Sequence, residues 1–241
     1  MDTRNISKLA LFPLTSEVSD QGHLCVGGCD VVDLARDFGT PLYIFDEFTF
    51  RHKCHEFKSE FSRHYADTLV IYAAKAFLNQ ALALIFRQEG LGIDVVSGGE
   101  LSIAHSVDFP LEMVYFHGNN KTPGELKLAL NWNVGRVVVD NFYELALLDR
   151  LGRERKVSQD ILLRLNPGVD PHTHQYTTTG ILDSKFGFPL ATGQAEEAVR
   201  IAMSASNLNL VGLHFHLGSP IFETGPYELA IELVLRFAQE M

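Results

Sequence analysis

The sequence has few cysteines, no basic run and no long uninterrupted apolar stretch. Its 241 residues include three cysteines and one tryptophan, and 20 Lys and Arg stand against 30 Asp and Glu, for a formal net charge of −10. An acidic chain repels a phosphate backbone, so we do not expect a nucleic-acid partner. Three cysteines are too few for a disulfide framework, which favours a reducing compartment.

Nothing in the sequence predicts membrane insertion or secretion. The longest weakly charged run, residues 69–86, is shorter than a typical membrane span and contains Lys75. The first residues carry charges without the apolar region of a secretory signal. The hydrophobic content of 46% is that of an ordinary globular protein. We therefore expect a cytoplasmic protein whose partner is a small molecule.

A short β-branched or aromatic run followed by a helical pattern recurs along the chain. The runs expected to form strands are residues 42–45, 69–74, 92–96, 113–117, 136–140, 161–166 and 211–217. The spacing between most of them fits one strand and one return helix. Repeated βα units predict a parallel sheet, and no GxGxxG motif follows the first run. The pattern therefore favours a (β/α)8 TIM-type barrel over a Rossmann fold.

The predicted barrel is incomplete. Residues 1–40 do not fit the repeat, because glycines break them into short extended pieces, so we place the start of the barrel at residue 41. A closed barrel typically needs ~250 residues. The chain ends inside residues 227–241, an apolar-striped helical pattern without a stop signal. We expect residues 41–241 to form an incomplete barrel and the chain to be an N-terminal piece of a longer protein.

Lys75 is the most informative candidate site residue. It follows the apolar run 70–74, at the carboxyl end of an expected strand, where barrel enzymes place their working residues. A lysine there is expected to be partly desolvated, which favours the neutral amine that forms a Schiff base. The alternative is a lysine that extends from the strand end into solvent.

The segment Ser97-Gly98-Gly99-Glu100 lies between an expected strand and an expected helix. Its glycines allow close approach of a ligand, and the N–H groups at a helix start can bind an anion. The alternative is an ordinary turn in which Glu100 complements the helix dipole.

His214 and His216 lie on one face of the last expected strand, since side chains alternate along a strand. The pair could be a metal site with His172 or His174 as a further ligand, a ring-stacking histidine with a packed neighbour, or a structural pair. Ser219 follows a glycine at the strand end, which suits a phosphate contact.

Taken in order, these motifs resemble the fold-type III pyridoxal-phosphate decarboxylases, which share an alanine racemase-like barrel. The matching segments are GTPLY (39–43), YAAK (72–75), DVVSGGE (94–100), FHGNNK (116–121), VVDN (138–141), LRLNPGVDPHTH (163–174), TG (179–180), DSKFG (183–187) and GLHFHLGS (212–219). FHGNNK and the NPGVDPHTH stretch favour the branch that acts on meso-2,6-diaminopimelate.

The resemblance implies a role for each candidate. Lys75 would hold pyridoxal 5'-phosphate as a Schiff base, His216 would stack on its ring, and Ser219 would contact its phosphate. The polar positions that frame the cofactor are matched by Asp94, Glu100 and Arg164. No metal is implied. The reaction would be decarboxylation of diaminopimelate to L-lysine, the last step of lysine biosynthesis.

The resemblance also implies parts that lie beyond residue 241: the glycine-rich phosphate loop, the acid at the pyridine nitrogen and a second, β-rich domain. Residues 1–40 would pack with that domain, and the family's enzymes are homodimers. The alternatives are a related decarboxylase of arginine, ornithine or carboxynorspermidine, a metal-dependent barrel hydrolase using His214 and His216, and an inactive binding relative.

Overall fold

The computed structural model describes residues 11–169, 185–219 and 221–241. It comprises two compact units. The first runs to Ile71 and includes Leu84–Leu91, and the second consists of Tyr72–Ala83 and Gly92–Met241. The division of the chain into an N-terminal segment, residues 1–40, and a barrel, residues 41–241, stays a prediction.

The first unit combines a small antiparallel sheet with two helices. Its elements are β1 (Glu17–Val18), β2 (Leu24–Val26), β3 (Cys29–Asp30), α1 (Val31–Phe38) and α2 (Glu47–His64). Asp30 and Asp46 cap the two helices by accepting hydrogen bonds from backbone N–H groups in their first turns. On α2, Cys54 is buried, whereas Phe57 and Phe61 are exposed.

The first expected strand is absent. Residues 42–45 are not part of any sheet, and their side chains are exposed, so this prediction is wrong. The local pattern of β-branched and aromatic residues favours extended backbone, but a strand also needs a neighbour with which to exchange hydrogen bonds.

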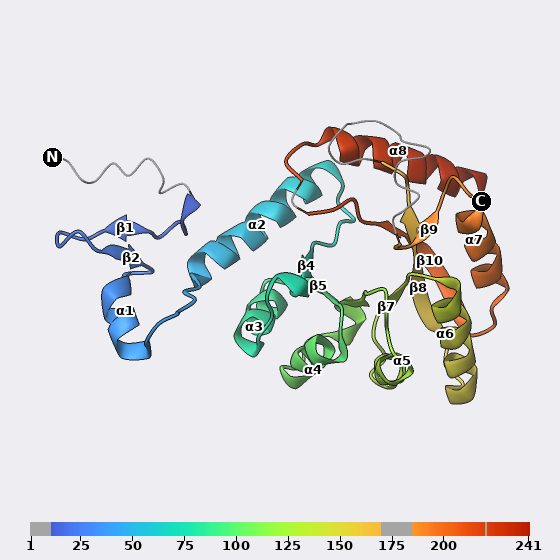
Figure 1. Ribbon diagram of the computed structural model, residues 1–241, viewed down its shortest axis with the longest axis horizontal. Helices are drawn as coiled ribbons and strands as arrows, with labels where there is room; N and C mark the ends of the chain where they lie inside the picture. The colour runs from blue at the N-terminus through green and yellow to red at the C-terminus, as the bar shows by residue number, and fades with distance from the viewer. Residues whose placement is uncertain (1–10, 170–184, 220) are drawn as a thin grey trace. The chain divides into compact units, whose positions relative to one another are not determined.

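The second unit is built around one curved sheet with helices outside it (Figure 1). Its strands, in the order β10-β8-β7-β6-β5-β4 with β9 beside β8, confirm the other six expected runs. The strands are β4 (Ile71–Ala73), β5 (Gly92–Val95), β6 (Val114–Phe116), β7 (Arg136–Val139), β8 (Gln159–Asn166), β9 (Phe188–Pro189) and β10 (Leu208–Phe215). Pairing is parallel from β5 through β10.

Helices return the chain between the strands. They are α3 (Gln80–Gln88), α4 (Gly98–Ser106), α5 (Pro123–Asn131), α6 (Phe142–Arg155), α7 (Gln194–Ser204) and α8 (Gly225–Glu240), with short 3-10 helices at η2 (Ala74–Ala76) and η3 (Leu111–Met113). Helix α5 begins as its sequence predicts, with Pro123 in the first turn and a reciprocal capping box between Thr122 and Glu125. None of the helices in the described ranges has both the length and the apolarity to cross a bilayer.

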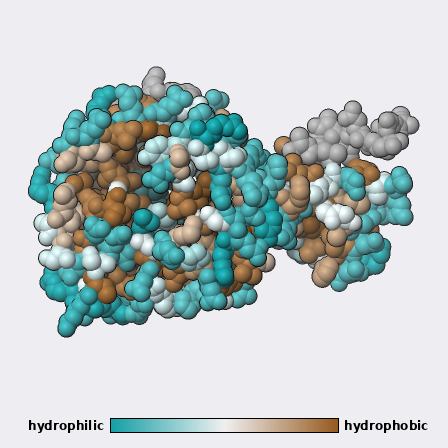
Figure 2. Space-filling model, turned by 180° about the vertical axis from the view of Figure 1, so that it is seen from behind, coloured by the Kyte–Doolittle hydropathy of each residue, from teal (hydrophilic) through white to brown (hydrophobic). Residues whose placement is uncertain are grey.

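The core lies between the sheet and these helices. Along β8, Ile161, Leu163 and Leu165 are buried and alternate with less buried residues. Within residues 11–169, 185–219 and 221–241, no pairing joins β4 to β10, so the sheet does not close. The fold is an incomplete (β/α)8 barrel, as predicted. Figure 2 shows hydrophobic areas among the exposed atoms, and Tyr227, Ile231 and Leu235 of α8 are at least 42% exposed.

Candidate active site

Lys75 lies immediately after β4, within the short helix η2. Ala74 before it is buried, but the Lys75 side chain is exposed, which differs from the expected partial desolvation. The reason is that β4 ends at Ala73 and the chain turns at once, so that the lysine projects from a turn. Its amine is therefore accessible to a ligand.

Asp94 is half-buried near the carboxyl end of β5, and its Oδ1 atom is buried without a hydrogen-bond partner in the described part of the chain. Burial, reinforced by the charge of Glu100, raises the pKa of Asp94 to about 7, while the positive charges of Lys75 and Arg164 oppose the rise. Lys75, Glu100 and Arg164 are therefore close enough to Asp94 for their charges to change its pKa. A carboxyl group with this pKa can hold or release a proton near neutral pH.

The raised pKa of Asp94 predicts a pH-dependent effect on stability. The pKa is higher in the folded chain (about 7) than its ordinary value of 3.8, so the stability that Asp94 contributes is fully present below pH 4 and is lost as the pH rises through 7. The neutral variant Asp94→Asn avoids this loss. Above pH 8 we expect its free energy of unfolding to exceed that of the wild type by about 4 kcal/mol, with little difference near pH 4.

Urea unfolding of the 241-residue chain at both pH values measures this difference. Asp67→Asn, at an exposed position, is the matched control and is expected to change little. A stability difference for Asp94→Asn that is the same at pH 4 and pH 8 would contradict the assignment.

The Ser97–Glu100 segment forms the start of α4. Ser97 caps the helix by accepting a hydrogen bond from the N–H of Glu100 (3.2 Å), and the Glu100 carboxylate accepts one from the N–H of Val96 (2.6 Å). The N–H of Gly98 donates a hydrogen bond to the Glu125 side chain on α5 (2.8 Å), so this N–H is not free to bind an anion. These contacts confirm the structural role weighed for Glu100, and its role toward a cofactor stays a prediction.

His214 is paired with His117, which lies just after β6. The Nε2 atoms of His117 and His214 lie 3.0 Å apart, with the rings nearly perpendicular at 73°. Burial lowers the pKa of His117 to about 2 and that of His214 to about 3, so both imidazoles are neutral at physiological pH. One ring nitrogen therefore donates a hydrogen bond to the other, which supports a structural role for His214.

His216 lies just beyond the end of β10 and is exposed. Burial of part of its ring, together with the positive charges of Lys75 and Arg164, lowers the pKa of His216. The neutral ring is thus near the lysine and free of the His117 contact, which supports His216 as the ring-stacking histidine. Ser219 is also exposed beyond β10. Its contact with a phosphate stays a prediction.

The metal hypothesis lacks a third ligand in the part of the chain that the structure describes. No group of three or more His, Cys, Asp or Glu side chains there is arranged to hold a metal ion. His172 and His174, the further ligands considered, lie outside the described residues.

Arg164 is fixed from two sides near the carboxyl end of β8. Its guanidinium donates to the Oδ1 atom of Asp140 (2.9 Å) and lies 4.9 Å from the centre of the Phe186 ring. Gly187, which has a φ of +74°, allows this loop to approach, since a Cβ atom there would lie 2.6 Å from the Arg164 carbonyl oxygen. The strand register places His214 beside Arg164.

Four residues of this region were not among the predicted site residues: His117, Lys121, Asp140 and Glu144. Lys121 and Glu144 form a buried ion pair (2.8 Å) beside Asp140. Two of the four could have been found from the sequence. Asp140 lies at the end of an expected strand, and Glu144 lies three residues after Asn141, which caps the following helix. The burial of Lys121 could not be predicted from the sequence, because the residues around it in the loop are mostly polar.

The charges that act on Asp94 and His216 thus bring together four of the six predicted residues, Lys75, Asp94, Arg164 and His216, and the charge of Glu100 also acts on Asp94. A family model described as the pyridoxal binding domain of the pyridoxal-dependent decarboxylases matches residues 48–241. The chain therefore belongs to the pyridoxal-dependent decarboxylase family, as the sequence motifs predicted.

The similar proteins point to one branch of that family. The chain is 46% identical to the diaminopimelate decarboxylase of Bacillus subtilis over 226 residues, which are 94% of this chain and 52% of that protein. It is 42% identical to the Mycobacterium leprae diaminopimelate decarboxylase over 225 residues, 93% of this chain and 47% of that protein. The chain spans about half the length of the curated relatives it matches.

Solved structures agree. The crystal structure of M. jannaschii diaminopimelate decarboxylase with L-lysine has a TM-score of 0.85 at 32% identity, covering 94% of this chain and 53% of that one. The Helicobacter pylori diaminopimelate decarboxylase, also with L-lysine, has a TM-score of 0.75 at 26% identity, covering 88% of this chain and 52% of that one. The barrel architecture is therefore confirmed as the first half of such a fold.

Proposed function

We propose that this chain forms the pyridoxal-phosphate-binding half of a diaminopimelate decarboxylase. The observation that carries the proposal is an accessible lysine amine, Lys75, whose charge acts on Asp94, a residue with one buried oxygen, Oδ1, that has no hydrogen-bond partner in the described residues; the chain that carries both matches the family's pyridoxal binding domain. The buried Asp94 oxygen lacks a protein partner, so it is available to a polar group of a bound ligand.

Lys75, Asp94, Glu100, Arg164, His216 and Ser219 are the residues proposed to hold the cofactor. When bound, pyridoxal phosphate supplies an aldehyde for a lysine amine and a ring that accepts the electrons left when CO2 departs. Lys75 offers the amine from its turn after β4. The neutral ring of His216 supplies a flat apolar face, and Ser219 offers a hydroxyl to the phosphate.

Charge organises the rest of the site. Arg164, held by Asp140, places a fixed positive charge near Asp94 and His216. Asp94, with a pKa of about 7, can take a proton from an incoming ammonium group or return one. Glu100 fixes the backbone after β5 through its bond to the N–H of Val96, and so holds the strand end that carries Asp94.

The proposed reaction removes one carboxylate of meso-2,6-diaminopimelate as CO2 and places a proton on the same carbon, giving L-lysine. The named relatives support this substrate. We further propose a cytoplasmic homodimer with a small-molecule amino acid as its partner, in line with the low cysteine content and the family resemblance.

Substrate choice tests the proposal. The extended protein, in which residues 1–241 are continued with the second half of the Bacillus subtilis relative, is compared with that relative itself on labelled diaminopimelate, arginine, ornithine and carboxynorspermidine, so that any change in preference reports on residues 1–241. We expect CO2 release from diaminopimelate to exceed that from each other substrate by about 10²-fold or more in kcat/KM, because an unmatched polar substrate end leaves buried groups unpaired. Preference for arginine or ornithine would overturn the substrate assignment.

A further inference from the structure

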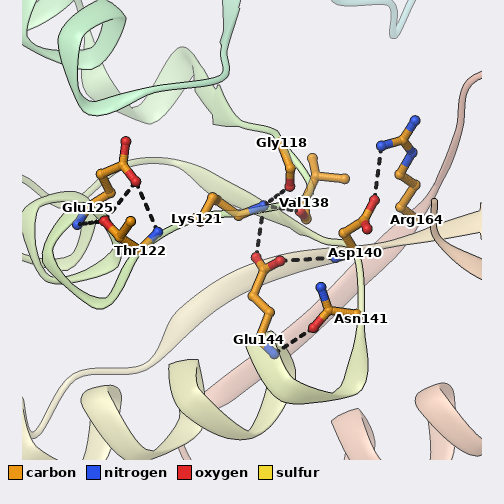
Figure 3. A network of polar contacts seen from close by, with 9 residues as sticks. All are labelled: Gly118, Lys121, Thr122, Glu125, Val138, Asp140, Asn141, Glu144 and Arg164. Atoms are coloured by element: carbon orange, nitrogen blue, oxygen red, sulfur yellow. Dashed lines mark hydrogen bonds and ion pairs between the residues drawn. The ribbon is translucent and has the colours of Figure 1, made fainter. Parts of the chain in front are cut away.

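A buried ion pair lies beneath the proposed site. The side chains of Lys121 and Glu144 are 1% and 4% exposed, and the Lys121 Nζ atom lies 2.8 Å from the Oε1 atom of Glu144 (Figure 3). Lys121 also donates to the carbonyl oxygens of Gly118 (2.6 Å) and Val138 (2.8 Å). Three acceptors surround one ammonium group, so its orientation is fixed.

Burying this ion pair contributes little to the stability of the fold, which points to another role for it. Removing two charges from water costs free energy, and their attraction offsets this cost only when the geometry is good. A protein in which two apolar residues replace such a pair is often as stable as the original. Burial lowers the pKa of Lys121 and raises that of Glu144, and their mutual attraction opposes both changes. The pair ties the loop after β6 to the end of β7 and to the first turn of α6.

A chain of contacts leads from this pair to Arg164. The second carboxylate oxygen of Glu144 accepts a hydrogen bond from the backbone N–H of Asp140 (3.2 Å). The Asp140 carboxylate, only 3% exposed, pairs with the guanidinium of Arg164 (2.9 Å). Figure 3 shows these residues in sequence, from Lys121 through Glu144 and Asp140 to Arg164.

We propose that Lys121 and Glu144 are positioning residues that set the orientation of Arg164 by fixing the backbone of Asp140. Lys121 holds the Glu144 carboxylate, Glu144 holds the Asp140 N–H, and Asp140 holds the guanidinium. The significance of Arg164 for the cofactor rests on the proposed function, but the chain of contacts does not.

The test measures how firmly Arg164 is held in the 241-residue chain. Phenylglyoxal, which modifies accessible guanidinium groups, is applied, and modification of each arginine is followed by mass spectrometry. Asp140→Asn weakens the direct contact with Arg164, so its modification rate serves as the reference for an Arg164 side chain that is no longer held by Asp140. The double variant Lys121→Met/Glu144→Leu removes both buried charges and leaves Asp140 in place.

We expect Arg164 to be modified about tenfold faster in both variants, the change expected when one charge-assisted hydrogen bond is released. Arg136, half-buried with its guanidinium 5.1 Å from the centre of the Tyr115 ring, is the control and keeps its rate. An unchanged Arg164 rate in the folded double variant would overturn the proposal. Should circular dichroism show that the double variant is unfolded, the nearly isosteric Glu144→Gln decides by the same criterion.

A second readout separates this inference from the proposed function. In the extended protein, fluorescence titration with pyridoxal phosphate is expected to show about tenfold weaker binding in the double variant. Faster modification of Arg164 without any loss of cofactor affinity would leave the chain of contacts intact and would instead contradict the placement of Arg164 at the cofactor.

Discussion

Replacing Lys75 by alanine in the extended protein is expected to reduce CO2 release from diaminopimelate by on the order of 10³-fold or more. The variant loses the only amine among the six residues proposed to hold the cofactor, and an amine is the group that forms a Schiff base with an aldehyde. Neither Asp94 nor His216 can replace a primary amine in that chemistry, so their presence does not rescue turnover. Labelled CO2 release at saturating substrate measures the loss.

Lys127→Ala is the matched control for Lys75. Both lysines are exposed, but Lys127 lies on α5, outside the proposed site. We expect the control variant to keep the wild-type rate. If Lys75→Ala retained turnover within about tenfold of the control, Lys75 would not be the attachment site. Loss of covalent catalysis is expected to reduce turnover far more than this.

The 241-residue polypeptide by itself is expected to release no measurable CO2 from diaminopimelate. In its described residues the sheet does not close between β4 and β10, and the curated relatives are about twice as long. An unpaired strand edge and the exposed apolar face of α8 accompany this incomplete barrel. Losing a single preorganised contact typically costs about 10²–10³ in rate, and several are expected to be missing together.

The rate of the 241-residue chain is compared with that of the extended protein under identical conditions. Activity within about tenfold of the extended protein would show that the residues needed for catalysis lie within this chain, and would contradict our account of the incomplete barrel.

Much of the barrel could be predicted from local sequence, because buried parallel strands are continuous apolar runs. Residues 92–96 and 136–140 are examples, and the structure has strands there. The run at 42–45 is also apolar, yet it is not a strand, since strand formation depends on pairing with a neighbouring strand that local sequence does not specify. The exposure of Lys75 was missed for a different reason: the strand end was located to within one residue, but the short helix η2 that turns the chain at once after it was not expected.

The site was predictable as a set of strand-end positions but not as a network. Asp94, Arg164 and His216 each follow from the rule that barrel strands present functional residues at their carboxyl ends. The pairing of His117 with His214 and of Lys121 with Glu144 depends on distances between separate βα units. Such contacts arise only when the sheet is assembled, so no spacing within the sequence indicates them.

The central claim is that Lys75 binds the cofactor. The most direct measurement treats the extended protein with equimolar pyridoxal phosphate, reduces the product with borohydride, and locates the added mass by peptide mass spectrometry. The account predicts one modified position, Lys75, with the label lost in Lys75→Ala and retained in Lys127→Ala. Label distributed over the exposed lysines, or concentrated on any lysine other than Lys75, would contradict it.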